Sequence, residues 1–495
     1  MSLNPSPPSA SIESLRRRLS AVGQDHVLKF YGELSPSQQD ALRDQLSLLD
    51  LESLPALVNA YVNHKPAFHV PHGVEPAPYY SITSPRPAPG SSILSWDPAA
   101  ARSRGEALIR AGKVAAFVVA GGQGSRLGYE GPKGCFPAGA VTGKPLFQMF
   151  AEQILAVQAR YGSTVPWYVM TSPLNHDATV GFFQQHAFFG LGPSNVMFFP
   201  QGTLPSLDIH TGRMLMASTH EVATNPDGHG GSLRALHKSG AIADMKRRGV
   251  EHISYFQVDN PIVRVVDPVF LGLHADPERS SAEMSSKMIP KAYPEEKLGM
   301  FCATPAREPG HAPRIEVIEY SDLPADLQAQ RLPSGSLRFL AGSIAVHVIS
   351  VAFVDRVNTD ASFDLPYHRA EKKIPCIDPR SGSPVNPASN NGVKLERFVF
   401  DSLPLCRRSV VLETNRIEEF APIKNATGVD SPDSSRQIQT RRAARWLAAA
   451  GIPVPLLPGG QPDCTLEIDP RSALEPSDID PRRTPPIIPG AAVVI

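Results

Sequence analysis

The sequence predicts an α/β protein built on a doubly wound, mostly parallel sheet, with a helical segment before it and a small lobe after it. Two observations support this. Short, continuous apolar runs at residues 114–120, 166–170 and 253–258 are typical of strands that are buried on both faces. Helical patterns at residues 146–161 and 232–248 lie between these runs. Strands that alternate with helices indicate a parallel sheet covered by helices on both sides.

The composition excludes several classes of partner. The 495 residues include 48 Lys and Arg against 48 Asp and Glu, so neither a basic nucleic-acid footprint nor an acidic tail is indicated. No apolar run approaches the ~18 residues of a membrane helix. Hydrophobic residues make up 42% of the chain, which is ample for a core. We therefore expect no nucleic-acid and no membrane partner, in a chain long enough for about three domains or two large ones.

Cysteine usage and the start of the chain indicate the compartment. The five cysteines are scattered without a CxxC pair, which argues against a disulfide framework and a Cys-based zinc site. The first eleven residues are rich in Ser and Pro, lack a basic-then-apolar signal pattern and are expected to be disordered. These features together predict a cytoplasmic protein.

The region before the sheet is predicted to be helical and then extended. Ser35-Pro36-Ser37-Gln38 is typical of a capping box with proline at the first helical position. An apolar stripe continues this helix through Leu42, Leu46 and Leu49. Residues 64–92 are rich in Pro, Tyr and Ser and indicate an extended linker. We assign residues 1–98 to an N-terminal helical segment and linker, and a further helix to residues 99–111.

The remainder divides into a central domain and a C-terminal lobe. Residues 99–400 hold the sheet, and strand and loop signals from about residue 283 predict an added β-rich layer. Residues 437–449 have a helical pattern, and Pro and Gly dominate from residue 452. We assign residues 401–495 to a C-terminal lobe with a loose, Pro-rich end.

The strongest local signal is a glycine-rich loop directly after the first strand. It reads Ala120-Gly-Gly-Gln-Gly-Ser-Arg-Leu-Gly128 and is followed by Gly131-Pro-Lys-Gly134. Glycines let backbone N–H groups approach a phosphate closely. Arg126 offers a planar fork for phosphate oxygens, and Lys133 offers a compact charge. A phosphate-binding loop is therefore favoured over a generic turn.

Two common phosphate motifs do not fit this chain. Gly139-Ala-Val-Thr-Gly-Lys144 is one residue shorter than a Walker loop and is followed by Pro145 instead of Ser or Thr. A dinucleotide fingerprint that starts at Gly122 needs its third glycine at position 127, where the chain has leucine.

The loop instead resembles the signature of the UDP-sugar pyrophosphorylases, Gly-Gly-x-Gly-(Ser/Thr)-Arg-Leu-Gly followed by Pro-Lys-Gly. Within that family the chain is most similar to the eukaryotic-type UDP-N-acetylglucosamine pyrophosphorylases, through ordered motifs from about His26 to Trp446. The resemblance implies a Rossmann-like nucleotidyltransferase core, UTP and a sugar 1-phosphate as substrates, and Mg²⁺ or Mn²⁺ as cofactor. We expect a monomer or a weak homo-oligomer.

Two further motifs are expected at the uridine. Gln201 follows an apolar run at 195–199, and its amide can contact a base edge, although a simple turn is the alternative. Residues 225–231 form a second glycine-rich loop ahead of a helix, which suits an anion or a planar base. By resemblance, Gln201 contacts uracil and the second loop packs on the base. The nucleotide-binding set is then Gly121, Gly122, Gly124, Gln201, Gly228 and His229.

Asp259 is the candidate metal ligand. It ends the run at 253–258, and the carboxyl edge of a parallel strand faces the crevice where such folds bind ligands. Mg²⁺ is normally held by one or two carboxylates and by substrate phosphates. The alternative is an Asp-Asn-Pro turn with local hydrogen bonds. The resemblance assigns the metal to Asp259 and a sugar contact to Asn260.

Four more residues are expected at the sugar by resemblance. Glu319, in a strand-like stretch at 314–321, binds sugar hydroxyls. Ser343 stands where the acetylglucosamine enzymes have an Asn that contacts the sugar. Phe398 and Phe400 are two residues apart and would share one face of a strand. By resemblance they line a pocket for the N-acetyl group, and otherwise they belong to the core.

The reaction implied is an in-line transfer. A phosphate oxygen of the sugar 1-phosphate attacks the α-phosphorus of UTP, and pyrophosphate leaves. Arg126 and Lys133, together with the metal, offset negative charge at the α-phosphate and the leaving group. Lys424, in Ala-Pro-Ile-Lys-Asn, orients the incoming phosphate by resemblance.

Two alternatives accompany this prediction. His229 and Ser343 favour a UDP-glucose or broad-specificity UDP-sugar pyrophosphorylase, whereas Phe398 and Phe400 favour an N-acetylhexosamine. A non-catalytic nucleotide-sugar binding protein is the second alternative, because a fold does not determine a function. The joint presence of Arg126, Lys133, Asp259 and Lys424 argues against it.

Overall fold

The computed structural model describes residues 11–66, 70–87, 92–306, 312–360 and 365–495. The chain forms two compact units, each built from segments that are distant in sequence. Unit 1 comprises Met1–His69, Gly202–Gly231 and Leu365–Phe398; unit 2 comprises Val70–Gln201, Ser232–Asp364 and Val399–Ile495. This organisation differs from the contiguous division at residues 98 and 400, because the pairing of residues 392–393 with residues 207–208 joins two distant segments of unit 1.

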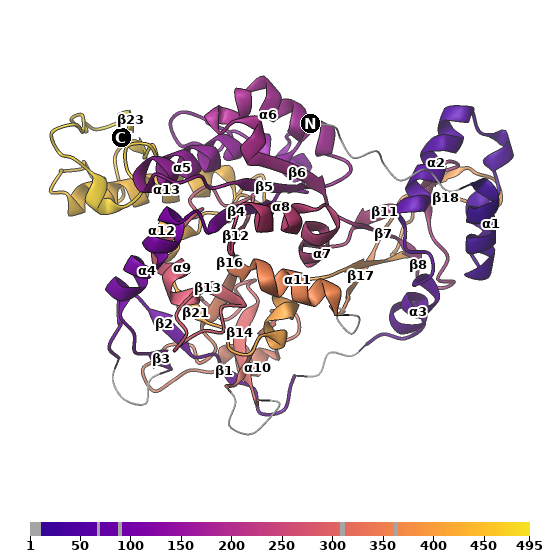
Figure 1. Ribbon diagram of the computed structural model, residues 1–495, viewed down its shortest axis with the longest axis horizontal. Helices are drawn as coiled ribbons and strands as arrows, with labels where there is room; N and C mark the ends of the chain where they lie inside the picture. The colour runs from indigo at the N-terminus through magenta and orange to yellow at the C-terminus, as the bar shows by residue number, and fades with distance from the viewer. Residues whose placement is uncertain (1–10, 67–69, 88–91, 307–311, 361–364) are drawn as a thin grey trace. The chain divides into compact units, whose positions relative to one another are not determined.

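A twelve-stranded sheet forms the centre of unit 2 (Figure 1). Its main path is β3 (Ile93–Leu94), β2 (Tyr79–Ser81), β21 (Val411–Glu413), β13 (Met284–Pro290), β16 (Ala341–Ser350), β12 (His252–Gln257), β4 (Val114–Val119), β5 (Trp167–Thr171) and β6 (Val196–Pro200). Along this path neighbours are parallel except at β16, which is antiparallel to β13 and β12. β14 (Met300–Thr304) joins β16 and also pairs with β1 (Glu75–Pro76) and β15 (Arg314–Ile318). The predicted mostly parallel sheet is confirmed.

The helices of unit 2 include several that the sequence predicts. They are α4 (Pro98–Arg110), α5 (Leu146–Tyr161), α6 (His176–Gln185), α7 (Gly231–Lys238), α8 (Ala241–Arg247), α9 (Pro268–His274), α10 (Ala325–Ala329), α11 (Val351–Thr359), α12 (Arg416–Glu419) and α13 (Pro432–Ala449). The first residue of α7 belongs to unit 1. Short helical turns are η4 (Ser125–Leu127), η5 (Lys133–Cys135), η6 (Ala187–Gly190), η7 (Pro193–Asn195), η8 (Val399–Leu405) and η9 (Pro476–Asp478).

Glycines determine two features of these helices. The single helix predicted at 232–248 is wrong, because Gly240 adopts a left-handed φ of 81° and separates α7 from α8. α4 and α9 lie side by side (Figure 1). A Cβ on Gly105 would stand 1.8 Å from the carbonyl oxygen of Pro268, so only glycine permits this approach.

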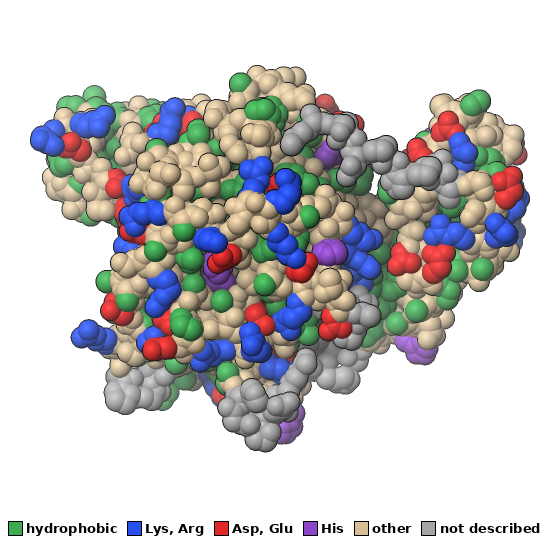
Figure 2. All heavy atoms as spheres, viewed as in Figure 1, with side chains coloured by type: hydrophobic (Ala, Val, Ile, Leu, Met, Phe, Trp, Pro, Cys, Tyr) green, Lys and Arg blue, Asp and Glu red, His purple; other side chains and the backbone are tan. Residues whose placement is uncertain are grey.

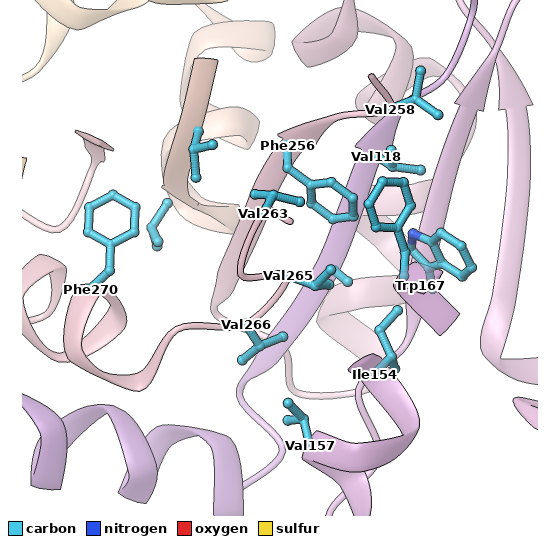
Figure 3. Close-up of a cluster of buried hydrophobic side chains, with 14 of the residues drawn as sticks. Val118, Ile154, Val157, Trp167, Phe256, Val258, Val263, Val265, Val266 and Phe270 are labelled. Atoms are coloured by element: carbon cyan, nitrogen blue, oxygen red, sulfur yellow. The ribbon is translucent and has the colours of Figure 1, made fainter. Parts of the chain in front are cut away.

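The core of unit 2 packs along β4, near the middle of the sheet. Every residue of β4 is buried, which explains why this run is apolar without alternation. Val118 of β4 lies close to Trp167 of β5 and Phe256 of β12, and Ile154 of α5 covers them (Figure 3). This packing fixes the carboxyl ends of β4 and β12, where the candidate site residues begin.

Unit 1 combines helices with small β-ladders. Its helices and turns are α1 (Ile12–Ala21), η1 (Asp25–Leu28), η2 (Tyr31–Glu33), α2 (Pro36–Leu48), α3 (Leu54–Val58) and η3 (Asn59–Asn63). Its strands are β7 (Thr203–Pro205), β8 (Leu207–Asp208), β9 (Met216–Ser218), β10 (Glu221–Val222), β11 (Thr224–Pro226), β17 (His368–Lys372), β18 (Cys376–Ile377), β19 (Pro384–Val385) and β20 (Gly392–Glu396). The predicted capping box is confirmed at Ser35 and Gln38, and Leu42 and Leu46 are fully buried. The predicted disorder of residues 1–11 lies outside the described residues, except that Ser11 caps α1.

Two segments that were expected to be extended or loose contribute strands to unit 2. The predicted linker at 64–92 supplies β1 and β2 to the main sheet. The C-terminal end pairs β22 (Thr465–Glu467) with β23 (Ala492–Val494). The carboxylate of Glu467 accepts 2.8 Å hydrogen bonds from the backbone N–H groups of Val141 and Thr142, which ties the lobe to the sheet domain.

The surface agrees with the balanced composition. On the face shown in Figure 2, acidic and basic side chains are interspersed, without a large area of one sign. Among the described helices, none combines the length and the apolar character that crossing a bilayer would require.

Candidate active site

The glycine-rich loop leaves β4 and folds back on itself. The N–H of Ala120 donates to the carbonyl of Met170 at 2.7 Å, and Lys133 N–H donates to the carbonyl of Gly122 at 3.0 Å. The N–H of Gly124 donates to Gly131 at 2.9 Å. A Cβ on Gly124 would lie 2.7 Å from the Tyr129 side chain, so the turn itself requires this glycine. Arg126 is exposed on η4, and Lys133 is half-buried.

Gln201 lies against the start of this loop. It directly follows β6, and its N–H donates to the carbonyl of Thr171 at 2.8 Å. A Cβ on Gly121 would stand 3.0 Å from the Gln201 side-chain oxygen. The side chain of Gln201 is therefore seated over the glycine backbone, and the structure brings together two residues that the sequence assigns to the nucleotide.

Four charged groups predicted for the reaction gather in unit 2. Burial lowers the pKa of Lys133, the positive charges of Lys424 and Arg126 lower it further, and Asp259 opposes the shift. The backbone connects the same residues: Lys133 Nζ donates to the carbonyl of Ile423 at 3.4 Å, and Ile423 N–H donates to the carbonyl of Asp259 at 2.8 Å. We define Arg126, Lys133 and Lys424 as the cationic cluster; Lys133 is within electrostatic range of the other two cations and of Asp259, which follows β12.

A second carboxylate, Asp430, lies beside this cluster. Its carbonyl accepts hydrogen bonds from the N–H groups of Lys424 at 2.6 Å and Asn425 at 3.0 Å. Burial raises the pKa of the Asp430 carboxyl, with Lys424 opposing the rise and the charge of Asp259 adding to it. Asp430 is not predicted from the sequence, because it stands six residues beyond Lys424 and outside the Ala-Pro-Ile-Lys-Asn motif. The loop that returns it to the site is visible only in three dimensions.

The side chain of Asn260, predicted to contact the sugar, is engaged in hydrogen bonds within the protein. Its side chain is buried, Nδ2 donates to the carbonyl of Glu419 at 2.6 Å, and Oδ1 accepts from Ala421 N–H at 3.0 Å. Both ends of the amide therefore hold the segment that leads to Lys424. This geometry makes Asn260 a positioning residue for the cluster.

Glu319 and Ser343 meet around one glycine. The N–H of Ser343 donates to the carbonyl of Gly299 at 2.8 Å, and a Cβ on Gly299 would lie 3.0 Å from Glu319 Oε1. The pairing of β13 with β16 shifts register next to Ser343, and Ala345 adopts a positive φ of 53°. Such a bulge redirects side chains, and here it accompanies two residues that the sequence assigned to the sugar.

In unit 1 the second glycine-rich loop packs on the chain after β20. A Cβ on Gly228 would lie 2.4 Å from the carbonyl oxygen of Arg397, and Gly230 N–H donates to that carbonyl at 2.7 Å. The His229 ring stacks on Phe398 with centroids 5.1 Å apart. Burial and the neighbouring His368 lower the pKa of His229 to about 4, so the ring is neutral at pH 7. These glycines allow a close approach of backbone to backbone.

The prediction that Phe398 and Phe400 share one face of a strand is wrong. β20 ends at Glu396, and η8 begins at Val399. Phe398 is half-buried in unit 1, between His229 and His368, whereas Phe400 is 6% exposed within η8 of unit 2. The two-residue spacing predicts a common face only when the backbone stays extended.

Comparisons with known proteins show the family to which this chain belongs. The family described as UTP–glucose-1-phosphate uridylyltransferase matches residues 90–431. UDP-N-acetylglucosamine diphosphorylase 2 of Arabidopsis thaliana is 36% identical over 462 residues, which cover 90% of this chain and 87% of that protein. UDP-N-acetylhexosamine pyrophosphorylase-like protein 1 of Homo sapiens is 37% identical over 484 residues, covering 93% and 92% of the two chains.

A solved structure shares the fold over nearly the whole chain. The UDP-N-acetylglucosamine pyrophosphorylase of Trypanosoma brucei, in complex with an inhibitor, superposes with a TM-score of 0.78 at 24% identity and covers 95% of each chain. The resemblance predicted from the glycine-rich loop is confirmed by the family match and by relatives of similar length. This chain belongs to the UDP-sugar pyrophosphorylase family of nucleotidyltransferases.

Proposed function

We propose that the protein is a Mg²⁺-dependent uridylyltransferase that makes a UDP-sugar and pyrophosphate from UTP and a sugar 1-phosphate, with N-acetylglucosamine 1-phosphate as the preferred sugar substrate. One observation carries the proposal. Lys133, just after the glycine-rich loop that follows β4, is within electrostatic range of Arg126, Lys424 and Asp259, and Asp259 follows the carboxyl end of β12, which pairs with β4. Ligands of open α/β sheets bind at this edge.

The chemistry needs no covalent intermediate on the protein. A non-bridging phosphate oxygen of the sugar 1-phosphate forms a bond to the α-phosphorus of UTP, and the bond from that phosphorus to the bridging oxygen of the β-phosphate breaks. Pyrophosphate carries away the electron pair. Arg126 and Lys133 offset the negative charge that gathers on the phosphates, and Lys424 orients the attacking group. Gln201, over Gly121, offers its amide to the uracil edge.

The carboxylates present suit a magnesium ion. Asp259 and Asp430 repel each other in unit 2, and a divalent cation between such groups relieves that repulsion. No cluster of three or more His, Cys, Asp or Glu side chains able to hold a metal occurs among the described residues. One or two carboxylates completed by substrate phosphates are the usual magnesium arrangement. When bound, Mg²⁺ or Mn²⁺ would be held by Asp259, with Asp430 in support, and would neutralise charge on the phosphates.

The sugar assignment rests on the relatives and on residues around Gly299. Both full-length relatives carry N-acetylglucosamine or N-acetylhexosamine in their names. Ser343 and Glu319 provide a hydroxyl and a carboxylate near Gly299, where sugar hydroxyls find partners. His229 and Ser343 support the competing proposal of a UDP-glucose or broad-specificity enzyme.

Pyrophosphate release tests these proposals. The purified protein is assayed with UTP, Mg²⁺ and the 1-phosphates of N-acetylglucosamine, N-acetylgalactosamine, glucose and galactose. A preference for N-acetylglucosamine supports the assignment, and a preference for glucose or galactose moves it to the competing enzyme. Tight UTP binding without turnover on any of the four sugars would indicate a non-catalytic binding protein. The Asp259→Asn variant, matched with Asp433→Asn at an exposed position of α13, reports whether turnover depends on the cluster.

The setting of the enzyme is also a proposal. All five cysteines are free thiols, three of them buried, which suits the reducing cytoplasm. We propose a cytoplasmic enzyme that acts as a monomer or a weak homo-oligomer, and sedimentation at several protein concentrations tests the oligomeric state.

A further inference from the structure

A second cleft lies in unit 2, away from the glycine-rich loop. It is bounded by α5, by residues 261–268, by α13 and by residues 467–475, and its cavity volume is about 70 Å³. Its apolar wall consists of Met149, Val157, Ile262, Val266, Ile468 and Leu474. Figure 3 shows Val157 and Val266 of this wall next to the core. Four arginines, Arg102, Arg160, Arg264 and Arg442, also line the cleft, together with the carboxylates Glu467 and Glu475.

Two of these arginines are neutralised within the protein. Arg102 Nη2 lies 2.8 Å from Glu475 Oε2, and Arg160 Nη1 lies 3.1 Å from Glu475 Oε1. Arg160 also pairs with Asp478. The charges of Arg102 and Arg160 are therefore balanced by carboxylates of the protein itself.

The other two arginines are largely buried and make no hydrogen bond to any described residue. The side chains of Arg264 and Arg442 are 24% and 16% exposed, and both Nε atoms are buried without an acceptor. Arg264 Nε stands 4.0 Å from Glu419 Oε1, and Arg442 Nε stands 3.9 Å from Glu418 Oε2. These separations exceed hydrogen-bond length.

The nearby carboxylates are occupied by other donors. Glu419 accepts from Lys287 and, at 2.7 Å, from Thr414 Oγ1. Glu418 Oε2 accepts from Trp446 Nε1 at 2.7 Å. Burial and the positive charge of Arg264 lower the pKa of Arg442 to about 10, so the two guanidinium groups are close enough to repel each other. The charges of Asp267 and Glu419 raise the pKa of Arg264, and the Arg442 guanidinium lies over the Trp446 ring at 4.5 Å. The buried Nε donors of both arginines nevertheless have no acceptor within the described chain, and buried donors in this state are expected to find one from outside it.

We propose that this cleft binds a small phosphate monoester or inorganic phosphate, held by Arg264 and Arg442. A phosphate dianion offers several oxygens to two planar guanidinium forks, whereas a single carboxylate is matched by one. The apolar wall would accommodate the organic part of a monoester. The cleft thus takes a phosphate compound that is not consumed in the transfer reaction.

The cleft is connected to the cationic cluster through the backbone. Arg264 stands five residues after Asp259, on the segment that leaves β12. It faces Glu419, whose carbonyl accepts the Asn260 amide at 2.6 Å, and Ile423 N–H donates to the Asp259 carbonyl. A phosphate that neutralises Arg264 and Arg442 would stabilise this arrangement. Resting on the proposed function, we expect it to raise the rate of pyrophosphate release.

Thermal unfolding of the full chain tests the site without relying on turnover. The probes are inorganic phosphate and glucose 6-phosphate, with acetate as the carboxylate comparison. Saturating phosphate should raise the melting temperature of the parent by roughly 1–3 °C. Arg264→Gln and Arg442→Gln should abolish the rise, whereas Arg441→Gln, an exposed neighbour on α13, should keep it. Lys133→Met distinguishes phosphate bound in the cleft from phosphate bound at the cationic cluster, and this variant should also keep the rise in melting temperature.

Several results would overturn the proposal. These are an unchanged melting temperature in the parent with both phosphates, a larger rise with acetate, or a rise that survives in both cleft variants but disappears in Lys133→Met. Arg442→Lys retains the charge and guards against loss of the fold, since it should restore part of the rise that Arg442→Gln abolishes. Binding without an effect on turnover would leave the phosphate site in place and remove the coupling to the cluster.

Discussion

Replacing Asn260 with alanine distinguishes a residue that positions the cationic cluster from one that touches the sugar. The change removes the donor to the Glu419 carbonyl at 2.6 Å and the acceptor for Ala421 N–H at 3.0 Å. Residues 419 and 421 are 3% and 0% exposed, so water cannot replace either bond. At about 1–3 kcal/mol for each of the two stranded groups, the free energy of unfolding should fall by roughly 2–6 kcal/mol.

The same change should also lower kcat. Lys424 follows Ala421 by three residues, and a displacement of about 1 Å at a catalytic group can reduce the rate by about 100-fold. We expect kcat to fall by roughly 10–100-fold, with a smaller change in KM for the sugar 1-phosphate. Asn260→Asp, which keeps an acceptor for Ala421 but sets an oxygen against the Glu419 carbonyl, should also lose stability.

Urea unfolding and steady-state pyrophosphate release measure the two effects. Asn195→Ala is the matched control, because that amide also donates to a backbone carbonyl, of Leu191 at 3.0 Å, but lies outside the cluster. A variant with the parent's stability and kcat, but with a strongly raised KM for the sugar phosphate, would refute the positioning role and restore the sugar contact.

Three other predictions concern charge, metal and packing. Lys133 has a lowered pKa, so activity should decline with rising pH before an ordinary lysine with a pKa of 10.5 would titrate; Lys133→Arg should move this decline upward in a pH–kcat/KM profile. Asp430→Asn should raise the Mg²⁺ concentration for half-maximal activity by about 10-fold if this carboxylate supports the metal, which a magnesium titration measures. Gly134→Ala would place a Cβ 2.1 Å from the Phe147 ring and should reduce the free energy of unfolding by about 1–3 kcal/mol in urea, while the same change at the open Gly181, inside α6, should raise it by about 0.5–1 kcal/mol.

Local sequence signals predict much of the fold of unit 2. β4 is apolar throughout because it is buried on both faces, and α5 has the predicted limits because its apolar stripe ends at a glycine that adopts a left-handed φ. The 232–248 helix is mispredicted because Gly240 is tolerated by a periodic pattern but takes a left-handed φ in the fold. The spacing of Phe398 and Phe400 misleads because β20 ends at Glu396, before both residues, and η8 begins at Val399.

The candidate site divides in the same way. Gly121 and Gln201 are predicted by residue type and do meet, since they follow the parallel strands β4 and β6 on either side of β5. Asp430 and the backbone bonds of Asn260 depend on a loop that returns from residues 419–430, and no local pattern encodes that return. Residue type within a motif therefore predicts which candidate site residues meet, as for Gly121 and Gln201, better than it predicts supporting contacts such as those of Asp430 and Asn260.

The discontinuous composition of unit 1 has a consequence for synthesis. Leu15 and Leu42 pack in one cluster with Val222, Val393 and Leu395. These leucines emerge from the ribosome well before their partners near residue 393, and at roughly 5–20 residues per second they wait for tens of seconds. During that interval the N-terminal helices present an apolar surface with no native cover, which makes the nascent chain a client for chaperones and gives truncated products a route to aggregation.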